Sequence, residues 1–205
     1  NLTKTAVTEI PATASSGGLR QVFMGLGWDV APAQPAARSG GLWGGLFGGG
    51  NSGGSASIDL DASCLAFDSQ GKLRDQVWFR QLRGLNGALE HTGDNLTGEG
   101  DGDDEVIRVD LSRLPADIMH LVFTVNSFRG QSFDRVQNAY CRLVDEATQT
   151  ELVRFTLSEA GSHTGLVLAR LLRQGSDWHF QALGDKTQGR TFQDMLPLIQ
   201  SCLAR

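Results

Sequence analysis

The chain has 205 residues, of which 40 % are hydrophobic and 20 % are charged, an ordinary balance for a globular protein with a buried core. Its formal net charge of −5 argues against a broad electrostatic attraction to nucleic acid or anionic lipid. The three cysteines are odd in number and form no Cys-x-x-Cys pair, which argues against a disulfide framework and a zinc ribbon. No stretch approaches the roughly 20 apolar residues that span a bilayer, and residues 1–10 lack a signal-peptide pattern. We therefore expect a soluble cytoplasmic protein with no nucleic-acid partner.

Two low-complexity segments interrupt the N-terminal part of the chain. Residues 1–18 are rich in Thr, Ala and Ser, and we expect them to form a flexible arm. Residues 31–56 are dominated by Gly and Ser and cannot bury enough surface to offset the entropy of ordering, which predicts a mobile loop. The sequence thus predicts one domain over residues 19–205, interrupted by that loop.

Four large apolar side chains stand out inside the Gly-rich segment, namely Leu42, Trp43, Leu46 and Phe47. They either fold back onto the domain or form an exposed patch that contacts a partner protein or a membrane surface. The sequence leaves both alternatives open.

From residue 57 onward the pattern is that of short strands, with alternating polar and apolar residues or β-branched and aromatic runs. Segments 165–173 and 178–183 flank the turn Gln174-Gly175-Ser176-Asp177, which predicts a hairpin. Two stretches are candidate helices, Leu114–Met119 and Phe192–Ala204. Many short strands with little helix predict an all-β fold, a β-sandwich with long loops and one or two short helices. The other predicted strands are 57–61, 64–67, 77–79, 105–111, 120–128, 139–145 and 152–157.

The most informative segment is His91–Glu105, which reads HTGDNLTGEGDGDDE. Its carboxylates repel one another, and no Lys or Arg occurs between Gly84 and Ile107 to neutralise them. The interleaved glycines let the backbone curl and turn its carbonyl oxygens inward. Carboxylate, amide and carbonyl oxygens are the ligands that calcium prefers, whereas an acidic loop that is merely solvated does not need these glycines. The candidate ligands in this segment are Asp94, Asn95, Glu99, Asp101, Asp103, Asp104 and Glu105.

Asp59 and Asp61 form a second acidic element, because residues two apart in a strand point to the same face. Asp29, at a Gly-rich turn, is a weaker third candidate. An EF-hand does not fit, because Cys64 stands where that loop needs glycine when it is started at Asp59. The sequence predicts a calcium site shared between the acidic run and this strand.

At these residues the chain resembles the TerD family of bacterial tellurium-resistance and stress-response proteins, especially its TerZ-type members. The similar stretches include GLGWD at 25–29, SIDLDASC at 57–64, VWFRQL at 77–82, HTGDNLTGEGDGDDE at 91–105 and NSFRGQSF at 126–133. The resemblance implies a β-sandwich that binds calcium, usually two ions, without enzymatic activity, and other stress-response proteins as partners. The chain departs from the family at ALGDKTQGRTFQDMLPLI, residues 182–199, so a partner surface there does not carry over.

Two alternatives accompany this interpretation. Asp59-Leu60-Asp61-Ala62-Ser63 approaches the D-x-D-x-[TV] motif of haloacid-dehalogenase-type phosphatases, but it follows a Gly- and Ser-rich segment instead of a buried apolar run. The other alternative is a scaffold whose calcium is purely structural. The sequence does not distinguish a structural from a regulatory ion.

Overall fold

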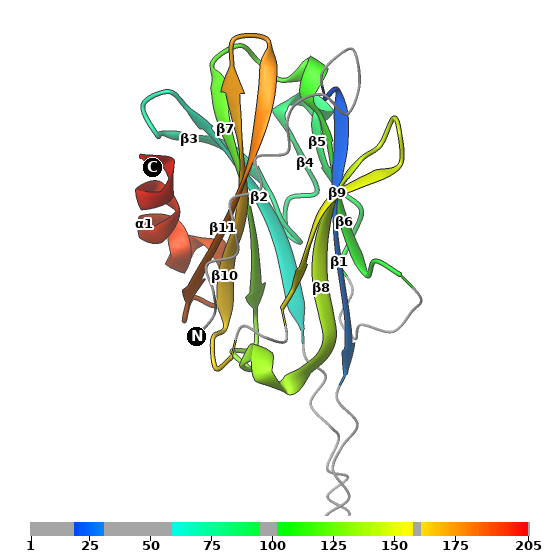
Figure 1. Cartoon of the computed structure of the whole chain (residues 1–205). Coiled ribbons are helices and arrows are strands. Elements are labelled where there is room, and N and C mark those ends of the chain that lie inside the picture. The colour runs from blue at the N-terminus through cyan, green and yellow to red at the C-terminus, as the bar shows by residue number, and fades with distance from the viewer. Residues whose placement is uncertain (1–18, 31–58, 95–101, 158–160, 205) are drawn as a thin grey trace, which may run out of the picture.

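In the computed structural model, two antiparallel sheets face each other, and a helix covers the outer side of one of them (Figure 1). The structure describes residues 19–30, 59–94, 102–157 and 161–204, so the predicted arm at 1–18 and the predicted loop at 31–56, with Leu42, Trp43, Leu46 and Phe47, lie outside the described residues. The strands are β1 (Gln21–Val30), β2 (Leu60–Asp68), β3 (Leu73–Val77), β4 (Arg83–Gly84), β5 (Leu89–His91), β6 (Glu105–Asp110), β7 (Ile118–Ser127), β8 (Val136–Asp145), β9 (Thr150–Thr156), β10 (Gly165–Gln174) and β11 (Asp177–Thr187). The helices are the α-helix α1 (Phe192–Leu203) and the 3-10 turns η1 (Leu85–Gly87), η2 (Leu111–Arg113) and η3 (Phe133–Arg135).

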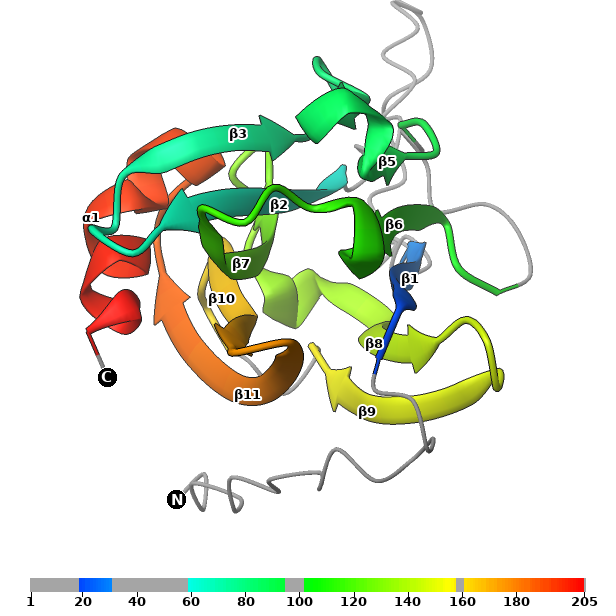
Figure 2. The same ribbon diagram turned by 90° about the horizontal axis from the view of Figure 1, so that it is seen from above.

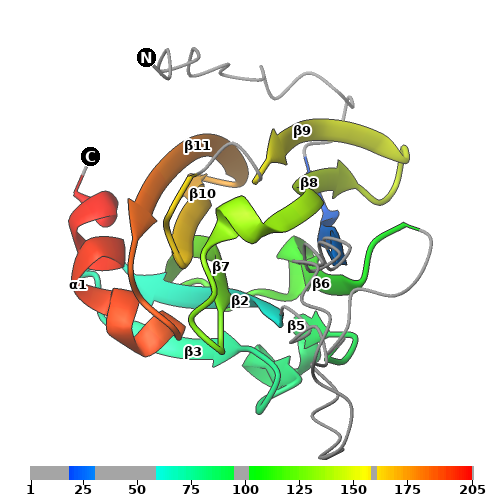
Figure 3. The same ribbon diagram turned by 90° about the horizontal axis from the view of Figure 1, so that it is seen from below.

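The six-stranded sheet has the order β4-β5-β6-β1-β8-β9, and the five-stranded sheet has the order β11-β10-β7-β2-β3. Views from above and below show the two layers, with α1 packed outside the five-stranded sheet (Figures 2 and 3). The hairpin predicted around residues 174–177 is confirmed, because β10 pairs with β11 from Gln174↔Asp177 onward. The predicted all-β sandwich is therefore the observed fold.

Strand β2 is buried along its whole length, since the other sheet covers one of its faces and α1 covers the opposite face. Because alternate side chains of a strand point to opposite faces, the side chains of β2 divide between the core and the contact with α1. Cys64 and Ala66 belong to the core between the sheets, whereas Leu65 and Phe67 pack with residues of α1. The two predicted strands at 57–61 and 64–67 thus correspond to one strand, β2, as far as the described residues extend.

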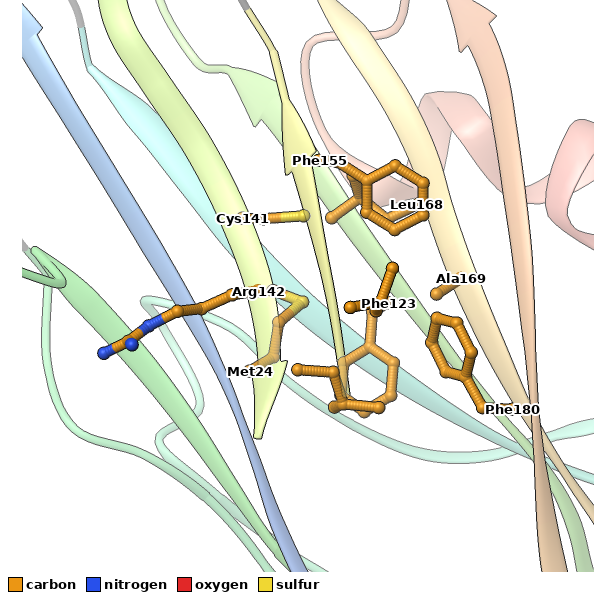
Figure 4. Close-up of a pocket in the computed structure, with 10 residues that line it drawn as sticks. Met24, Phe123, Cys141, Arg142, Phe155, Leu168, Ala169 and Phe180 are labelled. Atoms are coloured by element: carbon orange, nitrogen blue, oxygen red, sulfur yellow. The ribbon is translucent and has the colours of Figure 1, made fainter. Parts of the chain in front are cut away.

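The space between the sheets is filled almost entirely by apolar side chains. A small pocket there is lined by Met24, Phe123, Cys141 and Phe155, among others (Figure 4). The Arg142 side chain borders this pocket, and its guanidinium points away from the other labelled side chains. Burial raises the pKa of the Cys141 thiol, and Cys64 is likewise a buried free thiol. These cysteines are packed core residues.

One of the two candidate helices is confirmed and the other prediction is wrong. The C-terminal helix α1 begins at Phe192 with a capping box of Thr191 and Asp194. The segment 114–119 is instead a turn that leads into β7, which begins at Ile118. Pro115 explains the difference, because a proline disfavours the helical region for the residue before it, and Leu114 is extended with φ −67° and ψ 133°. No helix in the described part of the chain is long and apolar enough to cross a membrane.

A buried arginine attaches α1 to the five-stranded sheet. Arg170 in β10 donates to the carbonyl oxygens of Cys202 (2.8 Å) and Leu203 (2.9 Å) at the end of α1. The last carbonyls of a helix lack partners within the helix and carry partial negative charge, so the guanidinium satisfies and neutralises them together.

We predict that Arg170→Leu destabilises the attachment of α1 by about 1–3 kcal/mol, because the helix carbonyls then lose a buried charged donor. Hydrogen exchange measured over residues 192–203 should accelerate relative to the wild type. Arg173→Leu is the matched control, since Arg173 lies on the same strand but donates to Leu114 and Pro115. Equal exchange rates for α1 in both variants would contradict this role of Arg170.

Candidate metal centre

Three aspartates from two separate segments converge in space. Asp59 immediately precedes β2, Asp61 is its second residue, and Asp94 follows β5. Carboxylate oxygens of the three residues all lie within 4.8 Å of one another. Asp59 and Asp61 are 5 % and 3 % exposed, whereas Asp94 is exposed. The structure therefore brings Asp94 of the His91–Glu105 segment next to Asp59 and Asp61, while the metal-ligand role of these residues stays a prediction.

The cluster carries negative charge that the protein does not neutralise. Burial, followed by the nearby charges of Glu105, Asp59 and Asp94, raises the pKa of Asp61 to about 8. Burial and the charge of Asp94 also raise the pKa of Asp59, while Arg129 opposes this shift. Each shift means that ionising the group in place costs free energy.

Hydrogen bonding compensates only part of this cost. The Asn126 amide donates to Asp61 Oδ2 at 3.3 Å, and Arg129 Nε lies 3.6 Å from Asp59 Oδ2. Asp59 Oδ1 is buried and has no hydrogen-bond partner among the described residues. A buried carboxylate oxygen without a partner is costly, and a bound cation would remove that cost.

Glu105, the first residue of β6, reaches the cluster from the opposite sheet. It is fully buried, and its Oε2 accepts a hydrogen bond from the Ala62 N–H of β2 at 2.8 Å. His91 Nε2 lies 3.4 Å from the same oxygen. The Gly93 N–H donates to His91 Nδ1 at 3.2 Å, and this bond helps to hold the imidazole beside the carboxylate.

Asp103 is engaged elsewhere, on the outer surface of the six-stranded sheet. Its two carboxylate oxygens accept hydrogen bonds from Arg142 Nε and Nη2 at 2.7–3.1 Å, and one also accepts from the Tyr140 hydroxyl at 3.0 Å. The position of Gly25 makes this possible, because a Cβ there would lie 2.3 Å from the Asp103 carboxylate. Asp103 is therefore not among the residues that the structure brings into the Asp59 cluster.

Asp104 and Asp29 form a second, smaller acidic pair. The Trp28 N–H donates to Asp104 Oδ2 at 2.8 Å, and the Asn138 amide donates to Asp29 Oδ2 at 2.7 Å. Burial raises the pKa of Asp104, and the charges of Asp29 and Asp103 add to the shift. Asn95, Glu99 and Asp101, the remaining candidates from the acidic run, lie outside the described residues.

Three residues that support the cluster were not singled out as site residues from the sequence: Asn126, Arg129 and His91. Asn126 and Arg129 lie in the stretch NSFRGQSF, which carries part of the family resemblance, and this was the available signal. His91 could have been found from the alternation in β5, where Leu89 and His91 are buried and Glu90 between them is half-buried.

The donor set consists of hard oxygen ligands. Asp59, Asp61 and Asp94 supply carboxylates, and these residues fit a cation that prefers oxygen ligands in a flexible geometry. The thiols of Cys64, Cys141 and Cys202 are buried and are not part of this group. The group therefore offers oxygen ligands, without the sulfur ligands that zinc often uses in closed structural sites.

The comparisons with known proteins agree with this fold and sequence pattern. A family model described as the TerD domain matches residues 1–196. The chain is 53 % identical to the tellurium resistance protein TerZ of Serratia marcescens over 96 % of its own length and 95 % of that protein. It is 38 % identical to the stress response protein SCP2 of Bacillus subtilis (strain 168), over 91 % of this chain and 93 % of that one.

Among solved structures, the fold is similar to that of a homologue of telluride resistance protein (TerD) from Streptomyces coelicolor A3(2). The TM-score is 0.69 at 19 % identity, covering 87 % of this chain and 96 % of that one, which supports the fold alone. The matching domain model and the relatives confirm the resemblance drawn from the motifs: the chain belongs to the TerD family, whose named members include tellurium resistance and stress response proteins.

Proposed function

We propose that this protein is a calcium-binding, non-enzymatic member of the TerD family that acts as a calcium-dependent binding or scaffold module in tellurium resistance or a related stress response. The observation that carries the proposal is the cluster of Asp59, Asp61 and Asp94, two of which are buried, with Arg129 as the one cation that the described residues pair with it. The names of the relatives support the biological setting. The partners we expect are other stress-response proteins.

A bound divalent ion would reverse the energetics of the cluster. Without it, burial raises the pKa of both Asp59 and Asp61, and the charge of Asp94 adds to each shift. With it, the same carboxylates become ligands, and the unpartnered Asp59 Oδ1 gains a partner. Calcium fits because it accepts six to eight oxygen ligands in flexible geometry, whereas magnesium demands near-octahedral geometry and retains several waters.

The pair of Asp29 and Asp104 supports the expectation of a second ion. Both carboxylates already accept a hydrogen bond, from Asn138 and the Trp28 N–H. Carboxylate oxygens such as these are ligands that calcium accepts. We place the first ion at Asp59, Asp61 and Asp94, and the second at Asp29 and Asp104.

The fold gives no support to the phosphatase alternative for Asp59 and Asp61. Phosphatases of the haloacid-dehalogenase type are α/β enzymes with a parallel sheet covered by helices. Here, every strand pairing between described residues is antiparallel. The choice between a structural and a regulatory ion depends on affinity. Dissociation constants of about 10⁻⁷–10⁻⁵ M are those of sensors, and tighter binding implies a permanently loaded ion.

The first prediction from the proposed function concerns which metal ion the protein retains. After dialysis against equal concentrations of calcium, magnesium and zinc, the protein should retain calcium, with up to two ions per chain, because its site offers carboxylate oxygens. Elemental analysis of the dialysed protein measures this directly. Retention of zinc in preference to calcium, or of no metal at all, would contradict the proposed function.

The second prediction is that Asp61→Asn stabilises the calcium-free protein and weakens the response to calcium. In chelator at neutral pH, the variant should melt at a higher temperature than the wild type, because the wild type must either ionise this buried carboxyl or keep it protonated, and both cost free energy. Calcium should raise the melting temperature of the variant less, since the wild type gains about 2.7 kcal/mol at a hundredfold excess over Kd and the variant gains less. Thermal melts in both buffers measure the two effects.

Asp103→Asn is the matched control for this experiment. It removes one carboxylate of the same acidic run but breaks the contacts with Arg142 and Tyr140, so it should destabilise by about 1–3 kcal/mol in both buffers alike. A calcium-induced shift that Asp61→Asn leaves intact and Asp103→Asn abolishes would place the ion at Asp103 instead.

The third prediction is a dependence of stability on pH in the calcium-free protein. Because the pKa of Asp61 rises from 3.8 to about 8 on folding, the native state holds a proton that the unfolded chain releases above pH 4. Binding of this proton favours the native state at low pH, and the stability that it contributes is lost as the pH rises toward 8. The difference in the free energy of unfolding between wild type and Asp61→Asn, measured by denaturant titration in chelator, should therefore shift against the wild type between pH 4 and pH 8. A difference that is constant with pH would contradict the buried, protonated state of Asp61.

A further inference from the structure

The turn between β3 and β4 carries residues that a turn does not require. Reciprocal backbone hydrogen bonds between Trp78 and Gln81, at 3.0 and 2.9 Å, close it, with Phe79 and Arg80 as the two central residues. Such positions favour Gly, Asn, Asp or Pro for conformational reasons. An aromatic ring and a guanidinium at the tip therefore need an explanation other than chain reversal.

Aromatic rings from three different elements meet at this turn. Phe79 contacts Trp78 edge-on, with ring centroids 4.8 Å apart, and it contacts Phe128, which follows β7, at 5.4 Å. Trp78 in turn contacts Phe192, the first residue of α1, at 5.1 Å. Trp78, Phe79 and Phe128 remain partly exposed. The mutual contacts hold these rings in place, so a partner that binds them loses little additional side-chain entropy.

Two exposed arginines flank these rings: Arg80 lies against two of them, and Arg190 binds the backbone of Phe128. The Arg80 guanidinium is 5.2 Å from the centroid of Phe79 and 5.6 Å from that of Trp78. Arg190 donates through Nε and Nη2 to the carbonyl oxygen of Phe128, at 3.1 and 3.0 Å. None of the ion pairs in the described part of the chain involves either guanidinium. We call Trp78, Phe79, Arg80, Phe128 and Arg190 the aromatic–arginine patch.

We propose that the aromatic–arginine patch is a docking site for an acidic peptide segment of a partner protein, one that presents carboxylates next to apolar side chains. Arginine binds carboxylates through two parallel hydrogen bonds, and contact with a ring pre-orients its planar group. The exposed Leu82, just beyond the turn, extends the apolar part of the surface. Tryptophan and arginine are enriched at the energetically dominant positions of protein interfaces.

Charge complementarity selects this occupant over other anions. The chain as a whole has a net charge of −5, which disfavours extended polyanions such as nucleic acid or an anionic membrane, because their fields reach much of the protein surface. A peptide contacts only the patch, where neither Arg80 nor Arg190 forms an ion pair with an acidic side chain of the described residues. The apolar side chains of the peptide also pack against the edges of the aromatic rings, which a phosphate group alone would leave uncovered.

The test uses the full chain and a short fluorescein-labelled peptide of alternating glutamate and leucine, with binding followed by fluorescence anisotropy. We expect saturable binding that weakens with salt, at least tenfold tighter than that of the same peptide with glutamine in place of glutamate. Arg80→Glu should weaken binding about tenfold or more, a change typical of dominant interface residues. In an NMR titration, the amide signals of residues 78–82 and 128 should shift most.

Arg83→Glu is the matched control, because Arg83 is exposed, follows the same turn and is paired with Glu90 outside the patch. It should leave the affinity for the peptide within about twofold of the wild type, and melting temperatures should show both variants folded. Equal losses in the two variants would reveal non-specific charge attraction and overturn the proposal. Absence of binding, or stronger binding to phosphatidylserine vesicles or to single-stranded DNA than to the peptide, would also overturn it. Bound calcium is measured separately, by elemental analysis, so a failure of peptide binding can be told apart from a failure of the proposed calcium site.

Discussion

The carboxylate of Glu105 joins the two sheets at the point where the acidic residues meet. Glu105 begins β6 in the six-stranded sheet, and it accepts a hydrogen bond from the Ala62 N–H in β2 of the five-stranded sheet. Both partners are fully buried, so this bond is made where water does not compete with it. Its charge adds to the effect of burial in raising the pKa of Asp61. A contact between the two sheets thus also places negative charge near Asp61.

This coupling explains why a cation would matter to the fold as well as to function. A buried ionised carboxylate requires either a hydrogen-bond network or a counter-charge. Glu105 accepts a hydrogen bond from the Ala62 N–H and has the His91 imidazole near it. Asp59 has only the guanidinium of Arg129, at 3.6 Å, and its Oδ1 has no hydrogen-bond partner among the described residues. The deficit therefore lies on the side of the cluster formed by Asp59, Asp61 and Asp94. An ion bound there would bridge β2 to the segment after β5 and would add a second link between the sheets.

The sequence predicts most of the fold and part of the site, for reasons visible at individual residues. Alternation along β2 predicts that Asp59 and Asp61 share a face, because the period of a strand is local. The role of Asp103 could not be predicted in this way. By composition it matches the other acids of its run, but it contacts Arg142, 39 positions away, across a space that exists only because residue 25 is glycine. The helix predicted at 114–119 fails for a local reason, the effect of Pro115 on Leu114, which a stricter sequence rule would have detected.

The proposed ion site and the aromatic–arginine patch are neighbours through a short stretch of backbone. The Phe128 N–H donates to the Asp59 carbonyl oxygen at 3.2 Å, and Arg129, the next residue, is paired with the Asp59 carboxylate. Asn126, two residues before Phe128, donates both to Asp61 and to the carbonyl oxygen of Arg190. The loop after β7 therefore contacts both regions, and its residues are shared between them. An ion that bound the Asp59 carboxylate would compete with Arg129 for it. A resulting movement of this loop would shift Phe128, the neighbour of Arg129. Phe128 supplies both a ring of the patch and the carbonyl oxygen that accepts from Arg190.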